Sequence, residues 1–574
     1  MVVIDSHTTV QKDSALPPAS KTSWRFGDLS AAELMPQLQR HLLKQDSKAN
    51  WQLVWLNNDG QPVIGLLPKM IWGVYPMAND TLHSTKQASL YKVEKTCRSA
   101  VCDHSNINAD ASLDASINFS HDDSHNTSVT SYMSYSDWQE ELIVYSQNYD
   151  NNDGSLLANK DNQSPHYRHG LIGFISYDIS AHELSPTANI EMAEQPCALL
   201  GHYDIYLTAD ADSQSSWQLQ VNNHNNNSDS SSVQQDTNTL IITLISYLDS
   251  LDNQLSNENT NKKQHNKTPP LLLEAQWSKH QYQQAFHQTQ NYLQQGDCYQ
   301  INLTQVWSGC LSAYDDKYVT SLIDYLPALH ANTKAPFAGY VAIDNFNHKG
   351  ETDTSNRQFE LLSCSPELFF TFSKDVKTGK HHIRTKPIKG TMPRGLTTEQ
   401  DNDYKQQLIN SEKDRAENVM IVDLLRNDLG KYAKIGSVKV PQLFAIESFS
   451  NVHHMVSTIT AELKTDTHPL SVLFGSLPAG SITGTPKKRA VEIIAELEAA
   501  PRGAYCGTMG YMNFDGSGQW NVLIRTLQAT STADNSKQVS LWAGGGITVA
   551  SDCDAEYQEC LDKVGNLLSV LAND

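Results

Sequence analysis

One lysine, Lys389, lies in a segment whose residues restrict the backbone, residues 385–395. Pro387 and Pro393 fix φ on either side of it, and Gly390 lets the chain approach other groups closely. This composition predicts a turn that holds the amine in place. Desolvation favours the neutral amine, whose lone pair can attack carbon. Lys389 is therefore a candidate nucleophile, and the alternative is an ordinary solvated lysine beside a turn.

Carboxylates recur at helical spacing in two segments. A helix is predicted over 398–432, with an interruption and a cap near Asn410 and Ser411. By the i, i+3, i+4 rule one face of it carries Asp414, Glu417, Ile421, Leu424 and Asp428. A second helix is predicted over 554–571, with Glu556 and Glu559 on the flank of an apolar stripe formed by Tyr557, Leu561, Val564, Leu568 and Leu571.

Two helices that face each other with such carboxylates would offer hard oxygen ligands, which Mg²⁺ prefers. Magnesium keeps waters that a substrate oxygen can replace. The alternative is that the glutamates form ordinary solvated helix faces, with Glu559 paired to Lys563 four residues on.

Glu367 and two histidines are further candidates. Glu367 is followed by three apolar residues, and burial there would raise its pKa towards that of a useful acid. His453 and His454 are adjacent, so in a strand they point to opposite faces and at most one of them enters a given site. A hydrogen-bonded core histidine is the alternative.

Two glycine-rich segments, 477–487 and 543–547, are predicted to be turns. Neither matches the phosphate-binding GxxxxGK[ST] loop or the dinucleotide fingerprint. Both could present backbone N–H groups to an anion, the first with help from a helix N-terminus and two hydroxyls. Between them, Tyr511 and Arg525 supply an aromatic hydroxyl and a planar fork suited to a carboxylate.

The elements that must position these residues are mixed strands and helices. Strands are predicted at 171–178, 202–207, 298–305, 337–343, 358–362 and 368–372, and further helices at 278–295 and 488–497. There is no regular βαβ alternation and no internal repeat. The sequence therefore predicts an α+β fold with mostly antiparallel sheet.

The bulk composition narrows the possible functions. Within the 574 residues, the segments 99–165 and 208–268 are rich in Asn, Asp and Ser and are predicted to be disordered insertions. The net charge is −21 with no basic stripe, which argues against nucleic-acid and anionic-membrane partners. No apolar run reaches the roughly 20 residues of a membrane span, and the start of the chain lacks a signal-peptide pattern, so we expect a soluble cytoplasmic protein. The nine cysteines lack metal-binding spacing, so zinc is not expected.

Taken together, the motifs over residues 277–571 closely resemble the chorismate-utilising enzymes. The resemblance is carried by the segments 387–391, 414–424 with 426–428, 480–487, 524–526, and 543–546 through 556–559. It implies a catalytic domain at 277–571, an amino-terminal region at 1–270, and a large β-sandwich wrapped by helices.

The resemblance also implies a chemistry. Mg²⁺ would be held by Glu417, Glu556 and Glu559, with Asp414 behind them, and would neutralise the ring carboxylate of chorismate. The substrate's oxygens would be bound by Ser481, Tyr511, Arg525, Gly544, Gly545, Gly546 and Lys563. Lys389 would attack C2 while the C4 hydroxyl leaves, protonated by Glu367, and ammonia would then add at C4 and expel the lysine. His454 would position the departing hydroxyl.

Lys389 also indicates the branch of the family. Its presence favours formation of 4-amino-4-deoxychorismate, on the way to 4-aminobenzoate and folate, because the anthranilate-forming branch usually has alanine there. Anthranilate formation is the alternative. None of the nine cysteines has the setting of a class I glutaminase nucleophile. The resemblance therefore implies a glutamine amidotransferase subunit as the partner that supplies ammonia.

Overall fold

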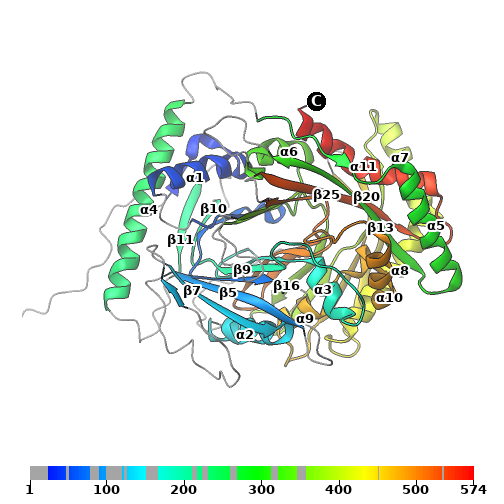
Figure 1. Ribbon diagram of the computed structural model, residues 1–574, viewed down its shortest axis with the longest axis horizontal. Helices are drawn as coiled ribbons and strands as arrows, with labels where there is room; N and C mark the ends of the chain where they lie inside the picture. Colours follow the sequence, from blue (N-terminus) through cyan, green and yellow to red (C-terminus); the bar gives the residue numbers. More distant parts are fainter. Residues whose placement is uncertain are drawn as a thin grey trace, which may run out of the picture.

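The computed structural model describes residues 23–46, 51–77, 89–98, 119–121, 126–149, 166–209, 216–222, 231–258, 268–311, 321–344, 357–449, 452–532 and 536–573. Two large sheets face each other and helices cover their outer sides and ends (Figure 1). Among the residues that the structure describes, every strand pairing in both sheets is antiparallel, as in β13 with β25 and β4 with β5. The α+β prediction and the β-sandwich expectation are therefore confirmed.

The first sheet has 12 strands among the residues that the structure describes. Their order is β1 (Ser23–Trp24), β11 (Trp217–Val221), β10 (Ile205–Ala209), β3 (Val63–Leu67), β2 (Val54–Leu56), β14 (Gly339–Asp344), β15 (Gln358–Ser363), β24 (Thr526–Ser531), β25 (Lys537–Ile547), β13 (Gln300–Leu311) and β12 (Glu274–Ala275), with β21 (Gly484–Thr485) also paired to β13.

Within the described ranges, the second sheet has 13 strands. Their order is β18 (Ile388–Pro393), β20 (Val452–Glu462), β17 (His381–Thr385), β16 (Leu368–Lys374), β23 (Gly518–Asn521), β22 (Thr508–Asn513), β8 (Gly170–Ile175), β9 (Ala198–His202), β4 (Met70–Tyr75), β5 (Leu90–Arg98), β7 (Asn126–Ser134) and β6 (Phe119–His121), with β19 (Lys439–Ser448) also paired to β20.

The α-helices lie around the sheets (Figure 1). They are α1 (Ala31–Gln45), α2 (Tyr135–Tyr149), α3 (Tyr177–Leu184), α4 (Ser231–Glu258), α5 (Lys279–Gln295), α6 (Leu326–Thr333), α7 (Thr398–Asn410), α8 (Glu412–Gly430), α9 (Pro469–Ser476), α10 (Lys487–Leu497) and α11 (Cys553–Ala572). Among them, none combines the length and the apolar character that crossing a bilayer requires.

The predicted helix boundaries in the second half of the chain are confirmed. Ser278 caps α5 through a reciprocal capping box with Gln281, and Gly296 ends the helix at φ +84°. The predicted interruption of the long helix is real: α7 ends at Asn410, and the Ser411 side chain caps α8.

Two predicted strands in the first half were wrong at their ends. The segment 171–178 stops being a strand at Ile175, because Ser176 caps α3. The segment 202–207 is not one strand: His202 ends β9 in the second sheet and Ile205 begins β10 in the first. The chain crosses from the second sheet to the first between these residues, which the sequence pattern had placed in one strand.

The prediction that 99–165 and 208–268 are disordered was wrong for the parts that the structure describes. The first contains β7 and α2, and the second contains β11 and α4. In α4 the side chains of Ile241, Leu244, Leu248, Leu251 and Leu255 are buried, at the spacing of one helix face. The overall composition of the segment is polar, so it did not reveal these regularly spaced apolar residues. The rest of the two segments lies outside the described residues.

The two sheets are shared by the regions 1–270 and 277–571. In the first sheet β2 pairs with β14, and in the second β8 pairs with β22. Each sheet therefore takes strands from both regions, and the boundary near residue 270 is not a break in either sheet.

Candidate active site

Lys389 lies in a bulge at the edge of the second sheet, where a turn was predicted. Strand β18 pairs Ile388 with Val456 and Thr391 with His454, so it has one more residue than β20 over this stretch. Gly390, at φ +82°, takes the conformation that such a bulge needs. The bulge directs the Lys389 side chain to a position that is only 15% exposed, with its Nζ 3.8 Å from Glu417 Oε2.

Gly390 has a second constraint, because helices α7 and α8 pack directly against it. A Cβ at this position would lie 2.8 Å from Asp414 Cγ and 2.8 Å from Leu408 Cδ1. We expect Gly390→Ala to lower the free energy of unfolding by about 2–3 kcal/mol in urea denaturation, from the positive φ and the clash together. Gly379→Ala is the matched control, since Gly379 has φ +68° with nothing within 4 Å of its Cβ position. An equal loss in the two variants would contradict the packing argument.

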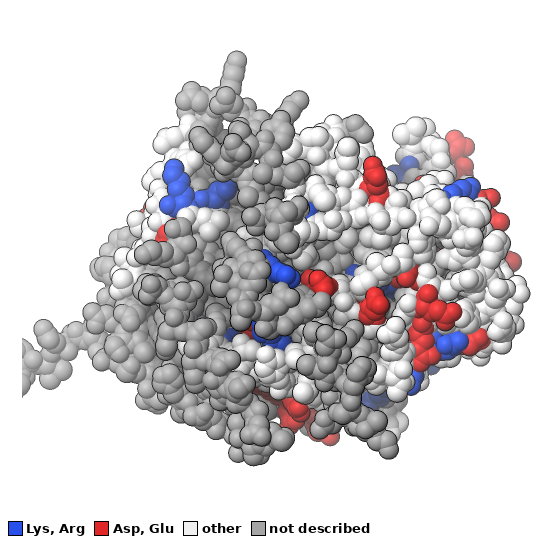
Figure 2. All heavy atoms as spheres, in the orientation of Figure 1, with Lys and Arg blue, Asp and Glu red and all other residues white. Residues whose placement is uncertain are grey.

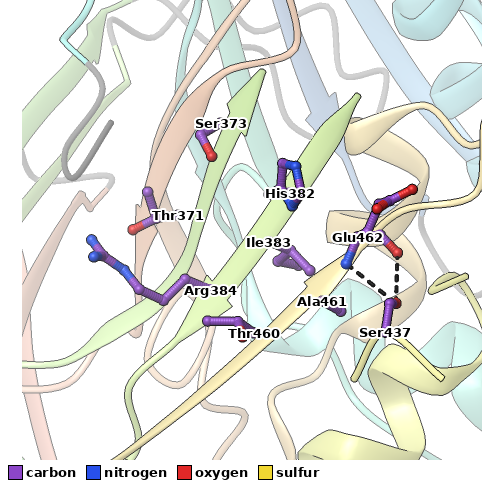
Figure 3. A pocket seen from close by; sticks show the side chains of 9 residues that line it. All are labelled: Thr371, Ser373, His382, Ile383, Arg384, Ser437, Thr460, Ala461 and Glu462. Atoms are coloured by element: carbon purple, nitrogen blue, oxygen red, sulfur yellow. Dashed lines mark hydrogen bonds between the residues drawn. The ribbon is translucent and has the colours of Figure 1, made fainter. Parts of the chain in front are cut away.

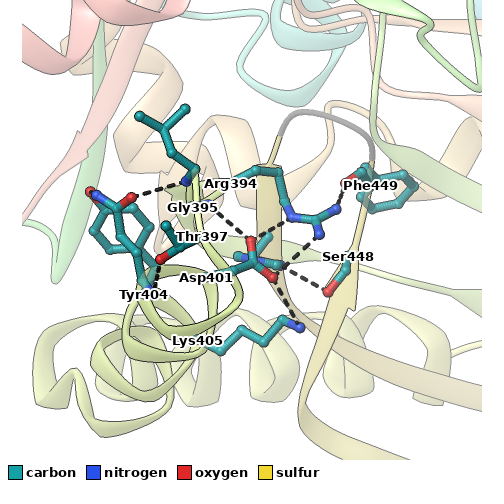
Figure 4. Close-up of polar contacts among 11 residues, drawn as sticks. Arg394, Gly395, Thr397, Asp401, Tyr404, Lys405, Ser448 and Phe449 are labelled. Atoms are coloured by element: carbon teal, nitrogen blue, oxygen red, sulfur yellow. Dashed lines mark hydrogen bonds and ion pairs between the residues drawn. The ribbon is translucent and has the colours of Figure 1, made fainter.

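The end of β18 is fixed by a polar network centred on Asp401 of α7 (Figure 4). Its carboxylate accepts hydrogen bonds from Arg394 Nε at 2.7 Å and from the Gly395 amide at 2.9 Å. It also contacts His453 Nε2 at 2.9 Å. The hydrogen bonds from Arg394 and Gly395 hold the pKa of Asp401 well below its usual value. The network therefore ties α7 to β18 and β20 at the strand that carries Lys389.

His454 points to the other face of β20 from His453, as the strand prediction required. Its Nδ1 lies 2.8 Å from Thr391 Oγ1, and the two groups share a hydrogen bond across β18 and β20. Burial lowers the pKa of His454 to about 4, and the Arg525 guanidinium adds to this effect. The imidazole is therefore neutral at physiological pH and acts as a hydrogen-bonding group.

Glu367 is buried at the start of β16, as predicted from the apolar residues that follow it. Burial raises the pKa of its carboxyl to about 7, although the Lys389 and Lys563 ammonium groups and a hydrogen bond from Ser481 oppose the rise. A carboxyl with this pKa carries a proton for part of the time at neutral pH. It can therefore act as a general acid.

Ser481 and Arg525 belong to the same centre as Glu367. Ser481 lies in a short 3-10 turn, Gly480–Ile482, and its hydroxyl is hydrogen-bonded to the Glu367 carboxyl. Burial lowers the pKa of the Arg525 guanidinium, which interacts with Cys364 and Glu367. Arg525 has φ +52°, an uncommon conformation for a residue with a side chain. Backbone strain of this kind often accompanies a functional position.

The three predicted metal ligands lie on α8 and α11 beside this centre. Glu417 is one turn into α8, and burial raises the pKa of its carboxyl while Lys389 and Lys413 oppose the rise. On α11, Glu556 is not on the flank of the helix as predicted. It is 2% exposed and continues the buried stripe formed with Cys560, Val564, Leu567 and Leu571.

Each of these carboxylates has a lysine beside it. Glu417 faces Lys389, Glu556 Oε1 lies 3.1 Å from Lys413 Nζ, and Glu559 Oε1 lies 2.6 Å from Lys563 Nζ. Burial alone would raise the pKa of Glu559, but the ammonium groups of Lys563, Lys413 and Lys389 together outweigh it and lower the pKa. The pairing of Glu559 with Lys563 is the alternative that the sequence left open.

As they stand, no three His, Cys, Asp or Glu side chains within the described ranges converge closely enough to hold a metal ion. Two observations nevertheless fit a cation between α8 and α11. Glu417 Oε1 is buried without a hydrogen-bond partner among the described residues. A Cβ at Gly545 would lie 2.8 Å from Glu556 Oε2 and 3.7 Å from Glu559 Oε1, so only a glycine leaves room for these carboxylates. The donor set consists of hard oxygens, which suit Mg²⁺.

The glycine run 544–546 was predicted to be a turn but lies inside β25. On one side it pairs with Asn302, Leu303 and Thr304 of β13. On the other side the pairing with β24 ends at Leu541, among the residues that the structure describes. Lys563 Nζ donates to Gly544 O at 2.7 Å along this side. The strand therefore presents backbone groups next to the carboxylates without forming a loop.

Tyr511 lies apart from the other predicted residues. It belongs to β22 and to a second core cluster, its ring centroid is 5.7 Å from that of Tyr167, and its hydroxyl is hydrogen-bonded to the Asn58 side chain. Among the described residues, the contacts recorded for Tyr511 are with this core cluster and Asn58, and not with Lys389 or the carboxylates of α8 and α11. The structure therefore brings together the predicted site residues except Tyr511.

An open cavity of about 380 Å³ lies elsewhere, on one face of β16, β17 and β20 (Figure 3). Alternate strand residues such as Thr371, Arg384 and Thr460 line it. Glu462, also in its wall, is paired with Lys380 at 3.0 Å and Lys434 at 3.2 Å. None of the predicted catalytic residues lines this cavity. On the face of the molecule drawn in Figure 2, acidic and basic side chains are interspersed.

With this geometry in place, comparison with known proteins is informative. A family model described as "chorismate binding enzyme" matches residues 110–569. The chain belongs to the chorismate-binding enzyme family. The match includes Lys389, Glu367, the carboxylates of α8 and α11, and the glycine run of β25, and it extends well into the region 1–270.

Two relatives bear the same functional name. The chain is 36% identical over 412 residues to aminodeoxychorismate synthase component 1 of Salmonella typhimurium, covering 71% of this chain and 78% of the relative. It is 42% identical over 305 residues to the protein of that name in Escherichia coli, covering 52% of this chain and 60% of the relative. The second match therefore spans less than two thirds of the relative's length.

A solved structure supports the fold. Anthranilate synthase component I from Streptococcus pneumoniae superposes with a TM-score of 0.54 at 21% identity, covering 79% of this chain and 91% of that one. At this identity the similarity shows the shared fold and does not distinguish between branches of the family.

Sequence reasoning missed two residues that the structure places beside the carboxylates. Lys413, four residues before Glu417, pairs with Glu556 across the two helices, and Ser551 Oγ donates to Glu556 Oε1 at 2.8 Å. Lys413 and Glu417 are four residues apart, a spacing that predicts an ion pair within α8 and not a contact with α11. Ser551 precedes the helix and carries no pattern of its own.

Proposed function

We propose that this chain converts chorismate and ammonia to 4-amino-4-deoxychorismate, as component 1 of an aminodeoxychorismate synthase. The names of the two relatives support this reading. The observation that carries it is the position of Lys389, a little-exposed amine between the acid Glu367 and the carboxylate Glu417.

The proposed chemistry uses two displacements. The Lys389 amine forms a bond to C2 of chorismate, both ring double bonds shift by one position, and the C4–O bond breaks. Glu367 gives its proton to the departing hydroxyl, which leaves as water. Ammonia then forms a bond to C4, both double bonds shift back, and the lysine leaves from C2 as the amine, while the proton released by the added ammonia returns to the Glu367 carboxylate. Neutral His454, held by Thr391, would orient the hydroxyl that departs.

Positive charge is needed because chorismate is a dicarboxylate. Arg525 is the candidate for one carboxylate, since its partly buried guanidinium belongs to the same centre as Glu367 and forms a planar fork that suits a carboxylate. Ser481, Lys563 and the backbone of Gly544, Gly545 and Gly546 are proposed to bind the remaining oxygens. Tyr511 stays in this list only as the sequence-based hypothesis, because its recorded contacts are in the second core cluster.

Glu417, Glu556 and Glu559 are proposed to bind Mg²⁺, with Asp414 behind them. When bound, the cation supplies charge neutralisation for the ring carboxylate of the substrate. The three glutamates would orient it between α8 and α11, and Ser551 would hold Glu556 in place.

Ammonia is proposed to come from a glutamine amidotransferase subunit, as the designation "component 1" in the relatives' names suggests. Anthranilate formation is the alternative within the family. It differs in the product, because anthranilate is released together with pyruvate whereas aminodeoxychorismate retains the enolpyruvyl group.

A product assay tests the proposal. The purified chain is incubated with chorismate, Mg²⁺ and ammonium at pH about 8, and the products are separated by chromatography. We expect 4-amino-4-deoxychorismate without pyruvate, loss of turnover with a chelator, and loss of turnover in Glu417→Gln. Anthranilate with an equal amount of pyruvate would overturn the proposal in favour of the alternative.

A further inference from the structure

Three lysines lie beside the carboxylates of α8 and α11, and one of these lysines has no part in the proposed function. Lys389 is the proposed nucleophile and Lys563 a proposed substrate ligand. Lys413, in the first turn of α8, reaches across to α11 and its Nζ donates to Glu556 Oε1 at 3.1 Å. A role for it must come from this contact.

The charge of Lys413 acts on all three of the proposed metal ligands. Burial alone would lower the pKa of Lys413, but the charges of Glu556, Glu417 and Glu559 raise it above its ordinary value. These are the three proposed ligands of the cation. One ammonium group therefore interacts with the same three carboxylates as the metal would.

Glu556 explains why a cation is needed there before the metal arrives. Its side chain is 2% exposed, and the contacts that the structure gives its carboxylate are Ser551 and Lys413. A buried carboxylate without a compensating charge is strongly destabilising. Lys413 supplies that charge.

The two partners differ in how easily they can move. The Lys413 side chain is 52% exposed, so its ammonium can turn into water, while Glu556 cannot leave the buried stripe of α11. The carboxylates are also not gathered as a metal site among the described residues. If Lys413 binds Glu556 and repels a metal ion, the exposure of its ammonium and the separation of the carboxylates are both explained.

We infer that Lys413 is a displaceable counter-ion of the metal site: it neutralises the carboxylates of α8 and α11 in the metal-free chain, and the divalent cation binds by displacing it. This inference rests on the proposed function, in which Glu417, Glu556 and Glu559 bind that cation. It makes the affinity for metal lower than the carboxylates alone would give.

The test measures binding of Mn²⁺, followed by electron paramagnetic resonance, to the chelator-treated full chain without substrate. Lys413→Met removes the competing charge, so we expect it to bind Mn²⁺ about tenfold more tightly than the wild type, the order expected for a partly buried ion pair. Unchanged or weaker binding in Lys413→Met would overturn the inference.

Lys431→Met is the matched control. Lys431 is 55% exposed and lies 3.2 Å from the buried carboxylate of Asp428, at the other end of α8. We expect its Mn²⁺ affinity to equal that of the wild type. A similar tightening in Lys431→Met would overturn the inference, since the effect would then come from net charge alone.

Thermal unfolding provides a second measurement. Without metal, Lys413→Met should unfold at a lower temperature than the wild type, because Glu556 loses its counter-charge. Added Mg²⁺ should raise its unfolding temperature by more than it raises that of the wild type, because ligand binding stabilises the folded state in proportion to affinity. An equal rise in both proteins would count against the inference.

The outcomes separate this inference from the proposed function. If the wild type binds Mn²⁺ and Glu417→Gln does not, the proposed metal site stands, and Lys413→Met alone decides the role of Lys413. If the wild type binds no Mn²⁺ with or without chorismate, both are overturned.

Discussion

Replacing Lys389 by alanine is expected to lower the rate of 4-amino-4-deoxychorismate formation on the order of 10³-fold or more. The reason is that the covalent route through C2 is then lost, and direct attack of ammonia at C4 is left. The rate is measured with saturating ammonium and Mg²⁺ by chromatography of the product. Chorismate binding should persist, because Arg525 and the metal carboxylates remain.

Lys386→Met is the matched control for this variant. Lys386 is three residues away, its side chain is 28% exposed, and it forms an ion pair with Glu447 on β19. We expect nearly wild-type turnover, since this ion pair does not include any proposed site residue. A loss as large as that of Lys389→Ala would mean that the segment as a whole, and not the amine of Lys389, is required.

A second measurement tests the covalent step itself. When ammonium is withheld, the first displacement should stop at the adduct, in which a C–N bond joins Lys389 to C2 and one water has left. Intact-protein mass spectrometry should then detect the mass of chorismate less one water on the wild type, and peptide mapping should locate it on Lys389. An enzyme that turns over with ammonia but never shows this adduct would contradict a long-lived covalent intermediate.

The elements around the site were predictable where the signal is local. Ser278 and Ser411 cap helices through contacts within three residues, so their sequence pattern contains the whole interaction. The burial of Glu367 was predictable for the same reason, because the strand residues that follow it are apolar. These features depend little on the rest of the fold.

Features that depend on distant partners could not be predicted in this way. The run Gly544–Gly546 suggested a turn, but pairing with β13 makes it a strand, and glycine is required at 545 because Glu556 lies against that position. Lys413 pairs across two helices, 143 residues apart in the chain. In both cases the interaction exists only once the tertiary structure has formed.

The position of Tyr511 also could not be predicted from the sequence. Its distance in sequence from Arg525 is short, yet it pairs with Ile172 and Gln519 in the second sheet, and its side chain enters the second core cluster. In a strand, a shift of one residue moves a side chain to the opposite face. Sequence proximity alone therefore could not decide whether Tyr511 or a neighbour faces the substrate.

Glu367→Gln is expected to lower turnover about 10²–10⁴-fold, the range that loss of a general acid usually costs. The amide keeps the size of the side chain and its ability to hydrogen-bond, but it has no proton to give to the C4 hydroxyl. Steady-state turnover with chorismate, ammonium and Mg²⁺ measures the loss. A variant with more than about half of wild-type turnover would refute the role as acid, whose loss should cost at least two orders of magnitude.

The role of Glu367 as an acid predicts how the rate of the first displacement changes with pH. The pKa of Glu367 is raised to about 7 by burial, so the protonated acid predominates below pH 7 and is lost above it. The step that protonates the hydroxyl should therefore slow as the pH rises through about 7, which single-turnover measurements of adduct formation can follow. In Glu367→Gln this limb should be absent from the profile.

Ser481→Ala should move the same limb in a predictable direction. The Ser481 hydroxyl donates to the Glu367 carboxylate and so opposes the rise in pKa. Without it the charged form loses a hydrogen bond, the pKa rises further, and the limb moves to higher pH. Because Ser481 is also a proposed substrate ligand, the position of the limb is the deciding quantity and not the absolute rate. A limb that moves to lower pH, or one that persists unchanged in Glu367→Gln, would show that another group supplies the proton.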